Sequence, residues 1–389
     1  MAVVNPHQFF DLPAESPDTL PYFHAVLGDG QLFRYVESER ESANTAVERF
    51  FAGYFGKEAA VAVANGTVGL RLSLQAAGVK PGDRVLVSAY SFIACAMAVA
   101  SVGAVPVPMD MDTALTVDAA ALKAAEGPVA AVMVVHVQGH AVPVGRVREL
   151  CDALGVPLIE DVCQGVGAAS PDGRAGALAD IAVTSFQQSK QISSGEGGLV
   201  AGTADLVERV YRLSDLGAVR HGGGLPDWDD ERAVMADNLR LTELQAALVM
   251  DQATALDDTL ARQRANRARL KEALGSQVTV LDSEHPAGDS GSHTLFVART
   301  ASDAQQFCAA LKAEDVVARV VWKKTFLEYG VFRQSGLTDE LSSQQWPKTA
   351  VALGPRILSV PVSKYVPESG VARVAEAVLN HRQHLAREW

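Results

Sequence analysis

The sequence has few cysteines and no closely spaced pairs of them. Cys95, Cys151, Cys163 and Cys308 are the four in 389 residues, and they stand far apart. This spacing excludes the paired ligands of a zinc-finger-type site and the dense framework of a disulfide-stabilised secreted domain. We therefore interpret all four as reduced thiols and expect no metal site.

Long apolar runs and an excess of positive charge are also missing. No apolar run is long enough to span a bilayer, and residues 1–20 lack a basic region followed by an apolar stretch and a cleavage site. Lys and Arg total 34 against 46 Asp and Glu, which gives a formal net charge of -12. Since nucleic acids and anionic membranes attract basic surfaces, we expect a cytoplasmic protein with neither as a partner.

Hydrophobic residues make up 48% of the chain and charged residues 21%, as in ordinary globular proteins. From about residue 58, short apolar or β-branched runs alternate with stretches of helical character, which is typical of βαβ units on a parallel sheet. The strands are near-continuously apolar, so we expect helices on both faces. Seven strands are predicted, at 59–65, 84–90, 104–112, 128–136, 156–161, 180–186 and 197–202.

The second part of the chain has a different pattern. Residues 220–237 are rich in glycine and charge and predict a long loop, and helical periodicity returns at 241–274. The remainder, with strand-like runs, suits a small α+β domain. We expect a large domain with its N-terminal segment at 1–255 and a small C-terminal domain at 256–389, because 389 residues exceed the usual size of one core.

One lysine, Lys190, stands among small polar residues between an apolar strand and a glycine-rich turn, within 185–198. Lysine acts as a nucleophile when it is neutral, and its best-known use is a Schiff base with a carbonyl or with pyridoxal phosphate. That hypothesis requires three further groups: an acid for the pyridine nitrogen, donors for the phosphate and a flat group against the ring.

Candidates for all three groups precede Lys190. Asp161 ends a strand, where ligands bind in open α/β sheets, although a strand-end carboxylate taken alone is more often a cap or an ion-pair partner. Gly66 and Thr67 lie between a strand and a helix, where backbone N–H groups bind phosphate, although, taken alone, a helix N-cap explains them better. Phe92 begins the next helix and could stack on the ring, although most such phenylalanines are core residues.

With these residues together, the chain resembles the DegT/DnrJ/StrS family of sugar and cyclitol aminotransferases, within the fold type I pyridoxal-phosphate enzymes. The resemblance runs in order over about residues 30–255. It is carried by the segments 64–67, 81–85, 103–107, 136–139, 159–168, 185–198 and 238–246.

The resemblance implies an α/β fold: a large domain with a mostly parallel seven-stranded sheet flanked by helices, and a smaller α+β C-terminal domain. It implies that Lys190 forms the aldimine with pyridoxal 5'-phosphate and moves the proton, that Asp161 pairs with the pyridine nitrogen, and that Gln164 lies near the phenolic oxygen. Phe92 would stack on the ring.

The same resemblance implies a phosphate site and a shared dimer site. Gly66, Thr67 and Ser185 would bind the phosphate, joined by Asn238 from the second subunit of a homodimer. Glu196, in the glycine-rich turn, is interpreted as a residue that fixes the loop.

The implied reaction is a ping-pong transfer of an amino group from glutamine or glutamate to a ketone of a cyclitol or sugar, in antibiotic-type biosynthesis. Lys190 separates the chain from related sugar dehydratases, which have histidine there. Ser185-Phe186-Gln187 favours members that act on cyclitols or make aminohydroxybenzoate, whereas Trp322-Lys323-Lys324-Thr325 departs from the usual pattern and leaves the acceptor open. The alternatives are a lyase, dehydratase or cyclase of the same fold, including an aminohydroxybenzoate-synthase-like activity, and a cofactor-binding regulator without turnover.

Overall fold

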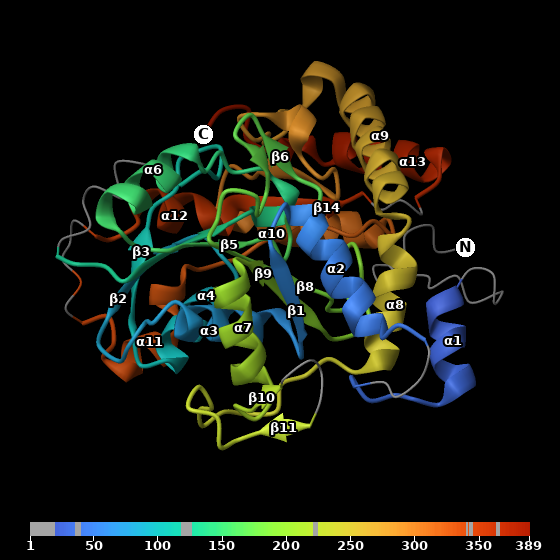
Figure 1. The fold of residues 1–389 in the computed structure, drawn as a ribbon. Helices are drawn as coiled ribbons and strands as arrows, with labels where there is room; N and C mark the ends of the chain where they lie inside the picture. The colour runs from blue at the N-terminus through green and yellow to red at the C-terminus, as the bar shows by residue number, and fades with distance from the viewer. Residues whose placement is uncertain are drawn as a thin grey trace.

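The computed structural model describes residues 20–35, 40–117, 127–220, 225–339, 341, 345–362 and 366–389. Its larger sheet has seven strands in the spatial order β1-β9-β8-β5-β4-β2-β3 (Figure 1). The antiparallel strand β9 pairs with β1 and β8, and all the other neighbours are parallel. The predicted seven-stranded, mostly parallel sheet is confirmed. Its strands are β1 (Ala59–Val63), β2 (Arg84–Ser88), β3 (Val105–Met109), β4 (Ala131–Val135), β5 (Leu158–Asp161), β8 (Ile181–Ser185) and β9 (Gly198–Gly202).

Helices cover both faces of this sheet, as the apolar strands predict. In β1, Val61 and Val63 lie in one core and Ala62 lies in another, because successive side chains of a strand point to opposite faces. The first face packs against α3 (Gly66–Ala76), α4 (Ala94–Ser101) and α7 (Ala204–Ser214), and the other against α2 (Ala43–Phe55), α6 (Gly145–Leu154) and α8 (Glu243–Ala253).

Helix α3 is fixed closely against the sheet. The Asn65 side chain caps the helix by accepting a hydrogen bond from Val68 N at 2.9 Å. A Cβ atom at Gly69 would lie only 2.9 Å from Val183 Cγ1, so glycine lets the helix approach β8. The N-terminus of α3 is thereby held near the carboxyl end of β8.

The helical stretch at 241–274 divides into two helices. Helix α8 ends at Ala253 and α9 (Leu256–Leu274) begins three residues later. Helix α8 packs against α2 and α1 (Pro21–Asp29), whereas α9 packs against α13 (Glu368–Asn380). A single straight helix could not serve both sets of neighbours, which explains the break.

Two other expected segments fall partly outside the described residues. The sequence of residues 117–127 also predicts a helix, and 118–126 of it lie outside the described residues. The expected loop at 220–237, described except for 221–224, contains a short pair of strands. These are β10 (Val219–Arg220) and β11 (Pro226–Asp227), which pair antiparallel.

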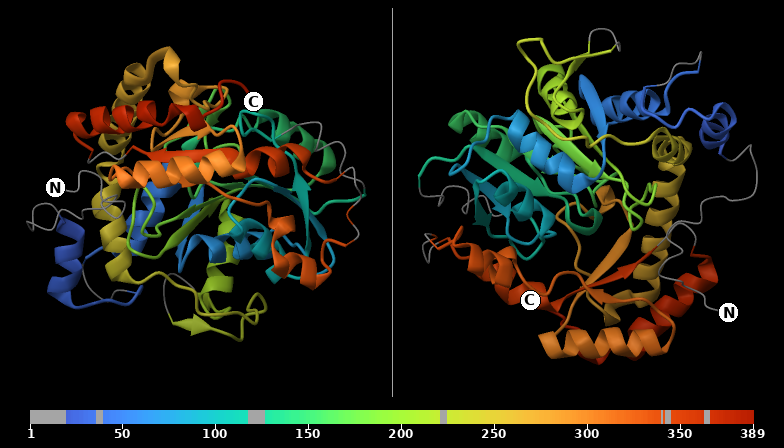
Figure 2. Two further views of the ribbon diagram at one scale, coloured as in Figure 1. Left: turned by 180° about the vertical axis from the view of Figure 1, so that it is seen from behind. Right: turned by 90° about the horizontal axis from the view of Figure 1, so that it is seen from below.

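A second, antiparallel sheet lies beside the first, in the order β12-β14-β13. Its strands are β12 (His293–Val297), β13 (Arg319–Val320) and β14 (Ile357–Pro361). Leu295 and Ile357 join the core of the larger sheet, whereas Phe296 and Leu358 join a separate core. Figure 2 shows α10 (Ala301–Ala313) and α13 on the side of the smaller sheet away from the larger one. The smaller sheet therefore has one face directed at the larger sheet.

Within the described ranges, no helix is long and apolar enough to cross a membrane. In the same part of the chain, no three His, Cys, Asp or Glu side chains come together as a metal site. The four cysteine thiols are free.

Candidate active site

A cavity of about 830 Å³ lies at the carboxyl end of β5 and β8, beside the N-terminus of α3 and the smaller sheet. Asn238, which follows α7 in the chain, is exposed and does not line this cavity. The structure brings all the other predicted site residues together at the cavity wall: Gly66, Thr67, Phe92, Asp161, Gln164, Ser185 and Lys190.

Asp161 ends β5 and is only 5% exposed. Its Oδ1 accepts a hydrogen bond from Cys163 N at 2.9 Å, and its Oδ2 accepts one from Cys95 Sγ at 3.1 Å. Among the described residues, no lysine, arginine or histidine forms an ion pair with it. A buried carboxylate without a cation is unfavourable, and a protonated pyridine nitrogen would supply the missing positive charge. The site therefore fits the ring of pyridoxal phosphate.

Cys95 was not predicted, because an isolated cysteine on a helix gives no sequence signal for a contact 66 residues away. Burial, and then the negative charge of Asp161, raise the pKa of the Cys95 thiol well above its ordinary value. The same two causes raise the pKa of Cys163. Both thiols therefore stay protonated, and Cys95 donates its hydrogen to Asp161.

The N-terminus of α3 forms an anion-binding corner with Ser185. The first amides of a helix have no acceptor inside the helix and carry partial positive charge, so Gly66 N and Thr67 N suit a phosphate. A Cβ atom at Gly66 would lie 2.9 Å from both Ser185 Cβ and Cys163 Sγ. Glycine is thus needed for this close approach, and the Thr67 and Ser185 hydroxyls add two further donors.

Lys190 is held by a compact turn after β8. Its backbone amide donates to Gln187 O at 2.9 Å, and Gln188 N donates to Gly195 O at 3.0 Å. Gly195 adopts a φ of +84°, which favours glycine. The Glu196 carbonyl accepts from Gln245 Nε2 at 3.1 Å, so the backbone of Glu196 helps to fix the turn. The half-buried Lys190 side chain lines the cavity.

Phe92 and Gln164 complete the predicted set. Phe92 is 52% exposed, which is unusual for a phenylalanine at the start of a buried helix, and its ring is available to a flat ligand. Gln164 Oε1 accepts from Gln138 N at 2.9 Å and from Gln138 Nε2 at 3.2 Å. Its amide group is thereby left to donate to a ligand oxygen.

The smaller sheet adds residues that were not predicted in the site. Ser292, His293 and Arg319 line the cavity, as does Trp322, whose backbone amide donates to Tyr90 Oη at 3.4 Å. No alternating pattern in the sequence marks them, because Thr294 is polar beside His293 and β13 consists only of Arg319 and Val320.

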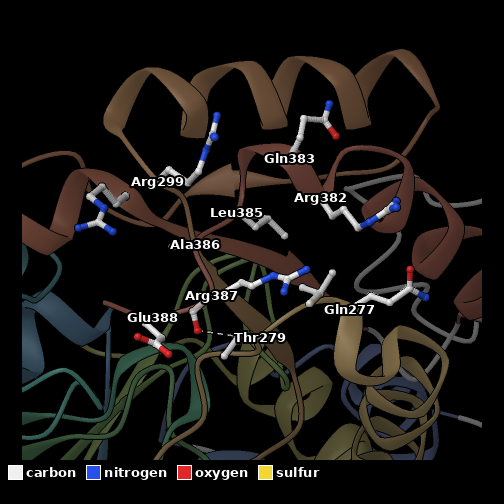
Figure 3. A pocket seen from close by; sticks show the side chains of 11 residues that line it. Gln277, Thr279, Arg299, Arg382, Gln383, Leu385, Ala386, Arg387 and Glu388 are labelled. Atoms are coloured by element: carbon white, nitrogen blue, oxygen red, sulfur yellow. Dashed lines mark hydrogen bonds between the residues drawn. The ribbon is translucent and has the colours of Figure 1, made fainter.

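A second cavity of about 710 Å³ lies beside the C-terminal residues (Figure 3). Of its described lining residues, none is a lysine, and the side chains of Arg299 and Arg382 point in different directions in Figure 3. Arg299 forms an ion pair with Asp303 at 3.2 Å. This cavity therefore lacks the groups that pyridoxal phosphate needs.

Known proteins share both the sequence and the fold. An L-glutamine:2-deoxy-scyllo-inosose aminotransferase from Streptoalloteichus tenebrarius is 34% identical over 271 residues, which is 68% of this chain and 64% of that protein's length. A 3-amino-5-hydroxybenzoate synthase from Amycolatopsis mediterranei is 36% identical over 64% of each chain. The crystal structure of a 3-amino-5-hydroxybenzoic acid synthase matches with a TM-score of 0.83 at 24% identity, covering 96% of this chain and 98% of that one.

A family model described as the DegT/DnrJ/EryC1/StrS aminotransferase family matches residues 22–379. The match extends the resemblance noted in the sequence, which covered about residues 30–255, through the smaller sheet. The chain belongs to the DegT/DnrJ/EryC1/StrS aminotransferase family.

Proposed function

We propose that the protein is a pyridoxal-phosphate-dependent aminotransferase that moves an amino group from glutamine or glutamate to a ketone of a cyclitol or sugar, in antibiotic-type biosynthesis. The observation that carries the proposal is a single cavity that contains the Lys190 amine, the cation-free carboxylate of Asp161 and the anion-binding N-terminus of α3. The similarity to a glutamine-dependent inosose aminotransferase supports the choice of donor and acceptor.

The cofactor would be held by residues from several elements of the larger sheet. Gly66, Thr67 and Ser185 bind its phosphate, and Asp161 keeps a positive charge on its ring nitrogen. Phe92 packs against the ring, and Gln164 donates to the ring oxygen. When bound, pyridoxal phosphate supplies an electrophilic carbonyl and a ring that withdraws electrons from the reacting carbon.

Lys190 acts both as the anchor and as the proton carrier. Its amine is the nucleophile in the cavity wall that would hold the cofactor at its carbonyl carbon. When free, the Lys190 amine would move a proton to or from the substrate carbon, which is general acid–base catalysis. The turn that fixes the Lys190 backbone limits this movement to the cavity.

The wall of the cavity suits an acceptor with several hydroxyl groups. Amide side chains of Gln138, Gln187 and Gln263 line it together with hydroxyls of Ser189 and Ser292. Such groups donate to and accept from alcohols, as a cyclitol or sugar requires. A lyase, dehydratase or cyclase, including aminohydroxybenzoate synthase, remains the second candidate because a protein with that name is among the relatives.

The donor half-reaction tests this function. The holoenzyme is mixed with L-glutamine or L-glutamate without an acceptor, and the absorbance of the cofactor is followed in a stopped-flow instrument. An aminotransferase loses the visible band of the lysine-bound cofactor and releases one keto acid per active site. A lyase or cyclase keeps the band and releases no keto acid. A ketocyclitol or a nucleotide ketosugar added afterwards should restore the band, and the one that does so identifies the acceptor class.

We also propose a homodimer with shared active sites. Residues 216–220 and 225–235 form a surface with exposed apolar side chains, and Leu225 is 90% exposed, Met235 99% and Trp228 55%. Trp228 Nε1 donates to Leu216 O at 3.0 Å, and the guanidinium of Arg212 in α7 donates to Arg232 O, so this surface is held against α7. Asn238 comes three residues after it, is exposed and does not line the cavity of its own subunit. A second subunit on this surface would receive Asn238 at its phosphate corner.

Mixing two inactive variants tests whether each active site contains residues of both subunits. Lys190→Ala removes the amine, and Asn238→Asp places a negative charge near the phosphate of the other subunit. After unfolding and refolding of a 1:1 mixture, random pairing leaves about a quarter of the sites with neither change. We expect activity near that fraction, measured with a donor and acceptor that react. If the mixture stays as inactive as its two components, the sites are not shared in this way.

The division of the chain and its location are proposals as well. We place the boundary between the two domains at 255/256, because α8 packs with the larger sheet and α9 with α13.

We place the protein in the cytoplasm, since free thiols persist in a reducing compartment.

A further inference from the structure

Arg319 lines the cavity without an acidic partner among the residues that the structure describes. Arg319 lies on β13, where it pairs with Ser359 of β14. Alternation along the strands places Arg319, Ser359 and His293 on the face toward the larger sheet. Ser359 Oγ donates to Gln138 Oε1 at 3.1 Å across the gap between the sheets. Arg319 therefore faces the cavity that contains Lys190.

Several arginines in the described ranges are paired with acids. Arg34 is 2.6 Å from Glu48, and Arg267 is 2.7 Å from Asp282. In the described ranges, no Asp or Glu forms an ion pair with Arg319. Burial among protein atoms lowers its pKa, and no neighbouring negative charge opposes that effect. The guanidinium is nevertheless open to the cavity, so an anionic ligand can reach it.

His293 orients the guanidinium without neutralising it. One guanidinium nitrogen of Arg319 is 3.5 Å from His293 Nε2, and His293 Nδ1 is 2.9 Å from Ser292 Oγ. Since arginine only donates, Nε2 accepts and the proton of the ring is on Nδ1, which donates to Ser292. Burial, then the charges of Arg319 and Lys190, lower the pKa of His293 well below its ordinary value. The neutral imidazole leaves the positive charge of Arg319 uncompensated.

We propose that Arg319 binds the α-carboxylate of the amino donor and that His293 is a positioning residue for its guanidinium. This inference rests on the proposed aminotransferase function. An amino acid donor carries a carboxylate beside its reacting amine, and arginine matches a carboxylate with two parallel N–H···O bonds. A cyclitol or sugar ketone has no carboxylate. The smaller sheet thus recognises the donor, while the larger sheet holds the cofactor.

The proposal is tested by pairing a change in the enzyme with a change in the donor. Arg319→Gln holoenzyme is compared with wild type in the half-reaction with L-glutamine and with L-glutaminamide, in which a neutral amide replaces the α-carboxylate. Loss of hydrogen bonds to a charged group predicts a fall of roughly 10- to 100-fold in kcat/KM for L-glutamine. The rate with L-glutaminamide should change little. Arg382→Gln, which removes an arginine from the other cavity, is the matched control and should change neither rate.

Binding without reaction gives an independent readout. Glutarate has carboxylates but no amine, and its dissociation constant is measured by calorimetry with the holoenzyme. Arg319→Gln should weaken glutarate binding roughly 10-fold or more, whereas Arg382→Gln should not. This measurement decides the role of Arg319 even if wild-type enzyme fails to react with every amino donor, an outcome that would overturn the proposed function alone.

Several results would overturn the assignment of Arg319. An equal loss with L-glutamine and L-glutaminamide would show that Arg319 supports the fold or the cofactor instead of the carboxylate. An unchanged rate with L-glutamine would remove any role in donor binding. A rate loss confined to the acceptor half-reaction would show that Arg319 binds the acceptor and not the donor, and would contradict the proposal.

The role of His293 needs a readout that separates binding from catalysis. His293→Asn should raise KM for L-glutamine several-fold and leave kcat nearly unchanged, because it loosens a binding contact present throughout the reaction. A fall in kcat at constant KM would contradict a positioning role.

Discussion

Lys190→Ala is expected to abolish turnover, with kcat lower by about 10³-fold or more. The amine would both anchor the cofactor and move the proton, and no second lysine lines the described cavity wall to replace it. The variant should also lack the visible absorbance of the lysine-bound cofactor. Its fold should persist, because the backbone contacts of the turn do not involve the Lys190 side chain. Absorbance spectra, steady-state kinetics and circular dichroism measure the three effects.

The matched control is Lys324→Ala. Lys324 is exposed, follows Trp322 closely in the chain and does not line the cavity. It should retain the wild-type spectrum and rate. If Lys190→Ala keeps its visible band, or if Lys324→Ala loses it, the assignment of Lys190 is wrong.

Asp161→Asn is the second change with a large expected effect. It keeps the shape of the side chain and removes the negative charge that faces the ring nitrogen. Preorganised charge of this kind contributes about 10²- to 10³-fold to a rate, so we expect kcat to fall by that amount. Part of the hydrogen bonding with Cys163 N and Cys95 Sγ can persist through the amide oxygen. The donor half-reaction in a stopped-flow instrument measures the loss.

Glu160→Gln is the control for Asp161→Asn. Glu160 precedes Asp161 in β5 and points to the opposite face, where its Oε2 is 2.8 Å from His136 Nε2 and 2.7 Å from Gly176 N. Its loss should lower the midpoint of urea unfolding while the rate of the folded enzyme stays near wild type. A loss of less than about 10-fold for Asp161→Asn would show that the charge on Asp161 is dispensable.

The sequence predicts the larger sheet well because its signals are local. Each strand is a short apolar run, and the residues with chemical roles stand at or soon after the end of a run, as Asp161 and Lys190 do. The carboxyl ends of β5 and β8 then meet at one edge because the strands are parallel neighbours. The parallel pairing of these strands is therefore enough to bring the site residues at their ends together.

The rest of the site depends on register and on contacts between distant segments. His293 and Arg319 belong to different strands, and the pairing of both β12 and β13 with β14 places them on one face. The contact of Cys95 with Asp161 spans 66 positions. The break between α8 and α9 follows from two different packing partners. Sequence periodicity carries none of this information, since it describes one segment at a time.

The two sheets divide the proposed reaction between them. Residues on the larger sheet and its helices hold the cofactor and carry the proton, and Arg319 on the smaller sheet receives the donor carboxylate. Separate changes at Lys190 and Arg319 should therefore have different signatures. The first removes the reaction with every amine, and the second removes only the preference for a carboxylate beside the amine.

Borohydride reduction tests the central claim most directly. Wild-type protein incubated with pyridoxal phosphate is reduced, which makes a lysine–cofactor bond permanent, and its peptides are then identified by mass spectrometry. We predict the pyridoxyl group on the peptide that contains Lys190 and on no other in stoichiometric amount. A label on another lysine, or no label, would contradict the account.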